Sequence, residues 1–235
     1  MLEGCRNDRG TMVMLLTVCL GQRPSGTVLF LVLATLLFGR VLGGSVDFRW
    51  KAWIDTKTGI AESWEKSSFR PAPVNLSRPK EREVCQRVFT EYPDWLAKPR
   101  VTFGLLRTKP IKDSTCVSLF GRWNVLRFGK YRLSTITRRG REVKTTILLP
   151  MVGGFMTLPH KDGCGVLEFS LVQRNDETRM ETKIAKGYRP ALAGRAPVHP
   201  LRAFTYRRTQ SLLHAYIMWR FHKHCYSHLV KRNKV

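Results

Sequence analysis

The chain has 235 residues and a formal net charge of +24, from 41 Lys and Arg against 17 Asp and Glu. Apolar residues make up 43%, which excludes a disordered basic tail because this share suffices for a core. The length indicates one main domain with appendages. The charge favours an anionic partner, either a lipid surface, a nucleic acid or an acidic ligand, and no signature of a particular reaction is visible.

The excess positive charge is concentrated in two parts of the chain. Residues 95–150 contain 13 bases and two acids, which is a net charge of +11. No acid follows Glu181, and the 12 bases beyond it add +12. These two parts therefore hold nearly all of the net charge.

Residues 1–44 are predicted to form a signal-anchor or a signal peptide. Residues 24–39 carry no charge, and counting on to residue 46 reaches about the 20 residues that a membrane-spanning helix needs, if Arg40 snorkels to the headgroups. In the alternative, a secretory signal peptide is cleaved near Val41-Leu42-Gly43. An organellar presequence and a buried core helix are further alternatives. A retained segment predicts a single-pass protein of the endomembrane system or an organelle, and a cleaved one predicts secretion.

Residues 45–78 are interpreted as an aromatic-rich juxtamembrane segment and linker. Phe48, Trp50, Trp53 and Trp64 follow the apolar segment directly, and Trp is enriched at the membrane–water boundary. Packing of these rings on the domain explains them equally well. Asn75 begins a glycosylation sequon, which matters only if the domain is lumenal.

Beyond residue 78 the pattern predicts a helix followed by strands. Pro79 is typical of a first helical turn, and apolar residues at helical spacing continue to about Trp95 with an interruption near Pro93. The apolar period then changes to two, and Gly153-Gly154 indicates a bulge or kink. Alternation occurs at 101–105, 117–119, 131–137, 143–149, 167–171 and 180–184. Turns are expected at 139–140, 162–163 and 175–176, so the segment predicts an antiparallel meander.

The last part of the chain, from about residue 201 to 230, has a helical period. A long helix after a series of hairpins must bury its apolar stripe, and the concave face of the meander is the available surface. This arrangement leaves a gap between helix and sheet. The predicted fold class is α+β: an antiparallel meander sheet grips a long C-terminal helix within a domain of residues 79–235, preceded by an N-terminal hydrophobic helix.

This order of elements resembles the helix-grip fold of START-like proteins, a group that includes lipid-transfer domains and polyketide cyclases. Local segments are similar to the end of an uncharacterised branch of that group: Phe169-Ser-Leu-Val-Gln173, Gly187-Tyr-Arg-Pro190, Tyr206-Arg-Arg-Thr-Gln210, His214 and Arg220-Phe-His222. The resemblance implies an apolar cavity between helix and sheet that binds a lipid or another hydrophobic molecule, occasionally with catalysis. It carries over no catalytic residue, because the members share shape rather than a fixed set of side chains.

The candidate ligand site follows from this arrangement. The expected cavity-lining residues are Phe169, Leu171, Met180, Ile184, Leu213, Ile217 and Phe221. The residues expected to meet an anionic headgroup are Arg138, Arg139, Arg207 and Arg208. If the cavity supports a cyclase- or isomerase-like reaction, His214 is the candidate general base.

Other chemistry has weaker support in the sequence. His224, Cys225 and His228 are neighbours on the predicted helix and include ligand types for zinc or copper, but their spacing is non-standard. We therefore predict no metal site and no cofactor, and interpret this helix as a basic one. Residues 122–144 interleave bases with aromatics, which suits a nucleic-acid platform or a sheet face beside an anionic membrane.

The sequence as a whole predicts a membrane-associated domain that binds a hydrophobic small molecule or lipid. Its expected partner is an anionic membrane surface, because an upstream anchor would hold the basic domain close to it. The alternatives are a cyclase- or isomerase-like enzyme that uses the same cavity and an organellar nucleic-acid-binding protein.

Overall fold

The computed structural model describes residues 47–102, 104–158 and 164–232, which belong to one compact unit. The predicted N-terminal helix lies outside these residues. Within the described ranges, no helix is both long and apolar enough to cross a membrane. The predicted turn at 162–163 also lies outside them, although β7 and β8 on either side of it do pair antiparallel.

In the described ranges, nine strands form one antiparallel sheet in the order β1-β2-β9-β8-β7-β5-β4-β3, and β6 also pairs with β7. The strands are β1 (Asp47–Ile54), β2 (Ala61–Phe69), β3 (Leu106–Ile111), β4 (Ser114–Leu119), β5 (Trp123–Gly129), β6 (Arg132–Arg139), β7 (Glu142–Gly153), β8 (Val166–Arg174) and β9 (Glu177–Ala185). β7 is long enough to pair with β6 along its first part and with β5 at its end. The predicted α+β meander is confirmed.

The helices are α3 (Pro79–Thr90), α4 (Tyr92–Leu96), α5 (Pro99–Thr102), α6 (Pro200–Arg208) and α7 (Gln210–Arg232), with a short 3₁₀ helix η1 (Ala191–Ala193). α3 and α4 confirm the predicted helix and its interruption, since Pro93 lies in the first turn of α4. The long C-terminal helix is also confirmed, but a separate α6 precedes it.

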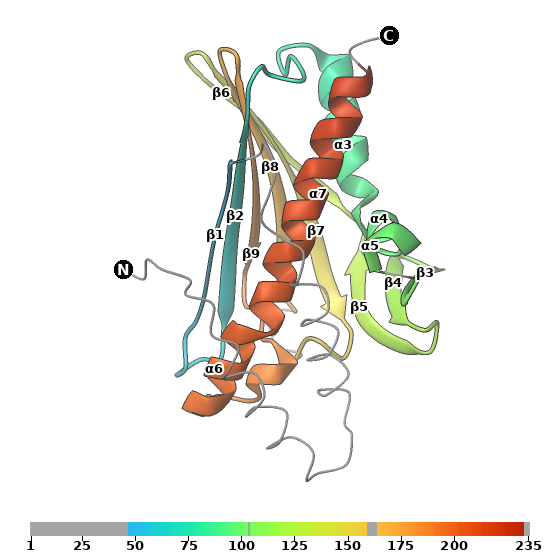
Figure 1. Ribbon diagram of the computed structural model, residues 1–235, viewed down its shortest axis with the longest axis vertical. Helices are drawn as coiled ribbons and strands as arrows, with labels where there is room; N and C mark the ends of the chain where they lie inside the picture. The colour runs from blue at the N-terminus through green and yellow to red at the C-terminus, as the bar shows by residue number, and fades with distance from the viewer. Residues whose placement is uncertain (1–46, 103, 159–163, 233–235) are drawn as a thin grey trace. The chain divides into compact units, whose positions relative to one another are not determined.

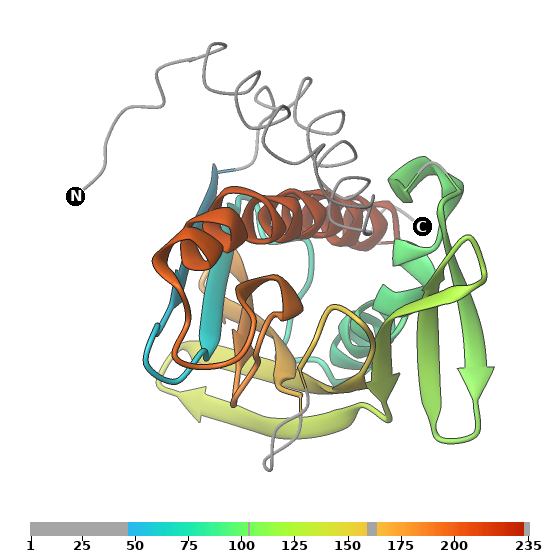
Figure 2. The same ribbon diagram turned by 90° about the horizontal axis from the view of Figure 1, so that it is seen from below.

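The curved sheet holds α7 and α3 on its concave face (Figures 1 and 2). One hydrophobic core joins the inner faces of β2, β7, β8 and β9 to these helices. A cluster of aromatic rings lies at its centre, where Phe169 of β8 meets Tyr92 of α4 and Phe221 of α7 at centroid distances of 5.3 Å. The strands β3–β5 form a separate lobe beside the main sheet (Figure 1).

Several local predictions differ from the structure. Residues 45–78 were expected to be a juxtamembrane segment and linker, but they supply β1 and β2, which extend the sheet beyond β9. Val101 and Thr102, expected at the start of a strand, belong instead to the short helix α5, which begins at Pro99. The expected irregularity at Gly153-Gly154 is confirmed, since the pairing of β5 with β7 shifts register there.

Candidate functional site

The concave face of the sheet changes from apolar to polar across its width. Strand pairing places Ile147, Phe169, Thr182, Glu65 and Trp50 in one row that runs from β7 to β1. Residues directly opposite each other on antiparallel strands share a face. The β7–β8 half of this row is therefore apolar, and the β9–β2–β1 half carries the polar groups.

Glu65 and His214 lie at the centre of the polar half. Every second residue of β2 faces the interior, and Glu65 is consequently 0% exposed. His214 Nε2 of α7 lies 3.3 Å from Glu65 Oε1, and the His214 side chain is 18% exposed. These atoms are at ion-pair distance without hydrogen-bond geometry. Neither carboxyl oxygen has a hydrogen-bond partner in the part of the chain that the structure describes.

Near this pair, two further buried polar atoms have no hydrogen-bond partner among the described residues. Ser63 Oγ lies two residues before Glu65 on β2, and Gln210 Oε1 lies one turn before His214 on α7. The other amide atom of Gln210, Nε2, donates to the Tyr188 hydroxyl at 2.5 Å. The interior between β2 and α7 thus holds four oxygen atoms for which the described residues provide no hydrogen-bond partner.

The charge of this carboxyl group acts on two of the buried tyrosines, Tyr92 and Tyr206. Burial raises the pKa of the Tyr92 and Tyr206 hydroxyls, and the negative charge of Glu65 raises both further. Burial likewise raises the pKa of Tyr188 well above its ordinary value. All three phenols therefore stay protonated at neutral pH, and the Tyr188 hydroxyl donates to Met156 O at 3.5 Å.

His222, two turns beyond His214, has a different environment. Its Nδ1 lies 2.7 Å from Ser67 Oγ and its Nε2 lies 2.8 Å from Thr182 Oγ1, so both ring nitrogens have hydroxyl partners. Burial, with a smaller contribution from His214, lowers the pKa of His222 to about 3. His222 is consequently a neutral residue that fixes α7 to β2 and β9.

The predicted cavity residues divide into two groups. Phe169, Leu171, Met180 and Phe221 are fully buried in the core, where the rings of Phe89 and Tyr92 pack on Phe169. Ile184 is also buried, whereas Leu213 and Ile217 are half-buried on α7. These contacts fill the interior beside β8 with side chains, and the unpaired polar atoms lie on the β2 side instead.

The four arginines expected to meet one headgroup are not brought together. Arg138 and Arg139 end β6, while Arg207 and Arg208 end α6, and these elements lie at opposite ends of the sheet (Figure 1). Arg138, Arg207 and Arg208 are exposed. They do not form a single surface.

The weak metal candidates are separated as well. Cys225 is buried in the core, while His224 stacks on Trp95 with its ring centroid 5.8 Å away. His224 and His228 have ring centroids 6.1 Å apart. Among the residues that can be described, no three His, Cys, Asp or Glu side chains are arranged to hold a metal ion.

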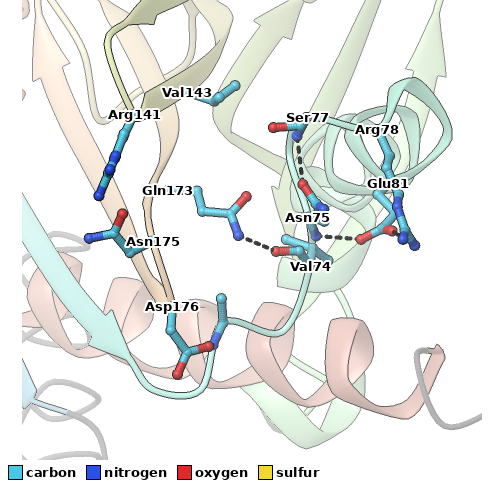
Figure 3. Close-up of a pocket in the computed structure, with 11 residues that line it drawn as sticks. Val74, Asn75, Ser77, Arg78, Glu81, Arg141, Val143, Gln173, Asn175 and Asp176 are labelled. Carbon is cyan, nitrogen blue, oxygen red and sulfur yellow. Dashed lines mark hydrogen bonds and ion pairs between the residues drawn. The ribbon is translucent and has the colours of Figure 1, made fainter.

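A surface pocket of about 640 Å³ lies where the β8–β9 turn meets the segment before α3 (Figure 3). Gln173 spans this junction: its amide donates to Val74 O at 2.9 Å and its Oε1 accepts from Leu76 N at 2.6 Å. Asp176 accepts from Ala72 N at 3.2 Å. These bonds attach residues 72–78 to the sheet, so the polar lining of this pocket has a structural role.

The sequon residue Asn75 lines the same pocket. It is exposed, its Oδ1 accepts from Ser77 N at 3.0 Å, and its backbone N–H donates to Glu81. Glycosylation of Asn75 stays a prediction that depends on the compartment.

Sequence reasoning found His214 but missed Glu65. The alternating positions of β2 are Ala61, Ser63, Glu65, Ser67 and Phe69, and all of them are buried. Small polar residues and an acid do not produce an apolar period of two, so the usual strand signal is absent. The remaining signal is that Glu65 is one of only 17 acids in a strongly basic chain.

Comparisons with known proteins add little to this geometry. No protein-family model matches the chain, and no curated protein matches it. CalU16 from Micromonospora echinospora is similar at 12% identity and a TM-score of 0.24, over 78% of this chain and 96% of CalU16. A hypothetical protein from Helicobacter pylori is similar at 12% identity and a TM-score of 0.24, over 66% and 85% of the two chains. TM-scores this low do not establish a common fold, so the helix-grip arrangement is supported by strand pairing and helix packing alone.

Proposed function

We propose that the domain binds an amphipathic small molecule whose hydrogen-bond donor, a hydroxyl or a protonated amine, meets Glu65 between β2 and α7. The observation that carries this proposal is a fully buried carboxyl group whose two oxygens accept no hydrogen bond within the described residues. Burying a carboxylate without hydrogen bonds costs several kcal/mol, so such a group is expected where a ligand supplies the missing donors. Ser63 Oγ and Gln210 Oε1 add two more acceptors for the same ligand.

The surroundings of Glu65 support a ligand with an apolar body. Ile184 is paired with Ser63 across β2 and β9, so an apolar side chain lies directly beside the polar ones. Trp50 is paired with Glu65 on the edge strand β1 and is 41% exposed. Trp50 and the partly exposed His214 are thus neighbours of the buried carboxyl group that reach solvent. The ligand therefore belongs to the hydrophobic or lipid class that the sequence predicts, with a donor group added.

The decisive experiment compares three amphiphiles that share one alkyl chain: dodecylamine, dodecanol and dodecanoate. Titration calorimetry below micelle-forming concentrations should show binding of the amine and the alcohol but not of the carboxylate. This order opposes the net charge of +24, which attracts the anion non-specifically. Glu65→Gln should weaken dodecylamine binding by about tenfold, since a charge-assisted hydrogen bond in the interior is lost.

The matched control is Glu62→Gln, which removes an acid from the opposite face of the same strand. It should leave dodecylamine binding unchanged. Equal affinity of all three amphiphiles, or equal affinity of the Glu65 and Glu62 variants for dodecylamine, would contradict the proposal.

A second candidate function is acid–base catalysis at the same place. The distance of 3.3 Å between His214 Nε2 and Glu65 Oε1 favours it, because an imidazole and a carboxyl group are the side chains most often used to move a proton. Turnover of a bound alkyl ketone that is lost in His214→Gln, with dodecylamine binding retained, would assign an enzyme rather than a binding protein.

A further inference from the structure

Three aromatic residues of the β3–β5 lobe and of the segment after β7 have exposed side chains. Phe120 and Trp123 flank the turn between β4 and β5 and are both 49% exposed, with ring centroids 6.2 Å apart. The backbone of Phe155, also 49% exposed, is bonded to the residue after Trp123, because its N–H donates to Asn124 O at 2.8 Å. We call these three residues the aromatic tip. Exposed rings grouped in this way mark an interaction surface.

An aromatic residue at position 120 strains the backbone of the turn between β4 and β5. Phe120 and Gly121 have φ values of 53° and 72°, a left-handed conformation that Asn and Gly adopt easily and a bulky residue rarely adopts. Hydrogen bonds fix this backbone, from Phe120 N to Leu105 O at 2.7 Å and from Arg122 N to Leu119 O at 3.0 Å. A phenylalanine at this position does not stabilise the turn, and about half of its side chain is exposed to solvent.

Two arginines, Arg107 and Arg122, lie at the aromatic tip. Residues 105–130 contain six bases against one acid, Asp113. The guanidinium of Arg122 lies 5.6 Å from the Trp123 ring centroid. Arg107 of the neighbouring strand passes close to Gly121 and is exposed. The lobe thus combines exposed rings with a net positive charge.

We propose that the aromatic tip inserts into the headgroup region of an anionic lipid bilayer. Tryptophan and phenylalanine partition to this boundary, and each nearby Lys or Arg adds attraction to anionic lipid. A single-stranded nucleic acid fits less well, because it requires free ring faces along a groove. Here Arg122 covers the face of Trp123, Phe120 meets Trp123 in an edge-to-face contact, and both rings lie at one turn. This surface is separate from the ligand site at Glu65.

The test uses tryptophan fluorescence of the full chain with vesicles whose acyl chains are brominated, since bromine quenches only tryptophans that enter the bilayer. All six tryptophans lie between residues 50 and 219, so the apolar segment at 24–39 contributes no signal of its own. Vesicles that contain phosphatidylserine should quench the wild type more than vesicles of phosphatidylcholine alone. Trp123→Ala should remove most of this additional quenching. Charge reversal at Arg107 and Arg122 should lower the affinity for the anionic vesicles by about tenfold or more.

Two variants serve as controls. Trp53→Ala removes another exposed tryptophan, 40% exposed on β1, and should leave the quenching that depends on phosphatidylserine unchanged. Phe120→Asn keeps a residue suited to the turn, so reduced quenching in this variant reports lost insertion rather than misfolding. Quenching that is independent of phosphatidylserine, or that falls equally in the Trp53 and Trp123 variants, would overturn the proposal. Binding of a single-stranded RNA that Trp123→Ala abolishes, without quenching by lipid, would replace the bilayer with a nucleic acid.

Discussion

At the scale of single residues, Glu65 and His222 show two ways of burying a titratable group on the same surface. His222 has a hydroxyl partner at each ring nitrogen and is neutral, so its burial is compensated. Glu65 faces the same helix from the same sheet with no hydrogen bond within the described residues. A compensated group contributes to the fold, whereas an uncompensated one is retained at a cost to stability and is the better candidate for function.

His222 leads to a prediction about pH. Its pKa is about 3 in the folded protein against an ordinary value of 6.5, so the unfolded chain binds roughly one more proton between these values. The contribution of neutral His222 to the free energy of unfolding should therefore be fully present above about pH 6.5. It should decrease by about 1.4 kcal/mol per pH unit as the pH falls toward the folded pKa. Urea unfolding of the wild type and of His222→Gln across this range measures the difference in slope.

The control for this measurement is His228→Gln, on the same helix but only half-buried. A change of slope that this variant shares with His222→Gln would be assigned to the helix rather than to the buried imidazole. If His222→Gln keeps the full slope, the acid sensitivity belongs to other groups and the neutral state assigned to His222 is wrong.

At the scale of elements, the sequence predicted what apolar periodicity encodes. It predicted α3 with its interruption, the strands from β6 to β9 and the long C-terminal helix, because apolar residues recur along these segments at the spacing of a helix or a strand. It did not predict β2, whose buried positions include two serines and a glutamate, and it therefore missed half of the candidate site. The end of α6 at Thr209 was also missed, because neither Gly nor Pro marks it.

The junction of β7 with the β3–β5 lobe gives a prediction at this scale. Gly154 has a φ of 115°, and a Cβ there would lie 2.4 Å from Val125 O, so Gly154→Ala forces the chain away from β5. We expect a loss of about 3 kcal/mol in the free energy of unfolding. Hydrogen exchange should rise in residues 123–129 and stay unchanged in 177–185, since only the lobe is displaced.

Gly140→Ala is the matched comparison, because Gly140 has a φ of 60° and no atom within 4 Å of an added Cβ. This variant should cost only about 1 kcal/mol, from the left-handed backbone alone. Equal losses in the two variants would show that the close approach of Gly154 to β5 contributes nothing.

At the scale of the whole molecule, the net charge of +24 opposes folding. The ion pairs between Arg70 and Glu177 and between Lys130 and Asp113 involve exposed basic side chains, so they offset little of this repulsion. Sodium chloride should therefore raise the midpoint of thermal unfolding by roughly several degrees, because salt screens like charges. An uncharged solute at the same osmolarity is the control, and an equal rise with both would show that the repulsion is unimportant.

The net charge of +24 predicts an anionic partner more strongly than any other feature of the sequence, but it does not specify which kind of partner. It indicated an anionic partner without locating a surface, since charge counts do not depend on where the chain places each residue. The four arginines selected from the sequence lie at opposite ends of the sheet, whereas the aromatic tip depends on a turn conformation that composition does not reveal. Membrane anchoring through residues 1–44 stays a prediction.

The β3–β5 lobe joins the rest of the sheet through β7, whose last residues pair with β5. Glu65 lies on β2, three strands away from β7 in the order of the sheet, and the aromatic tip lies beyond β7 on its other side. Substitutions at the two places share no strand, so their free-energy effects should be independent. Natural selection could then change what this protein contacts on its outside without altering what it holds inside, and the reverse holds equally.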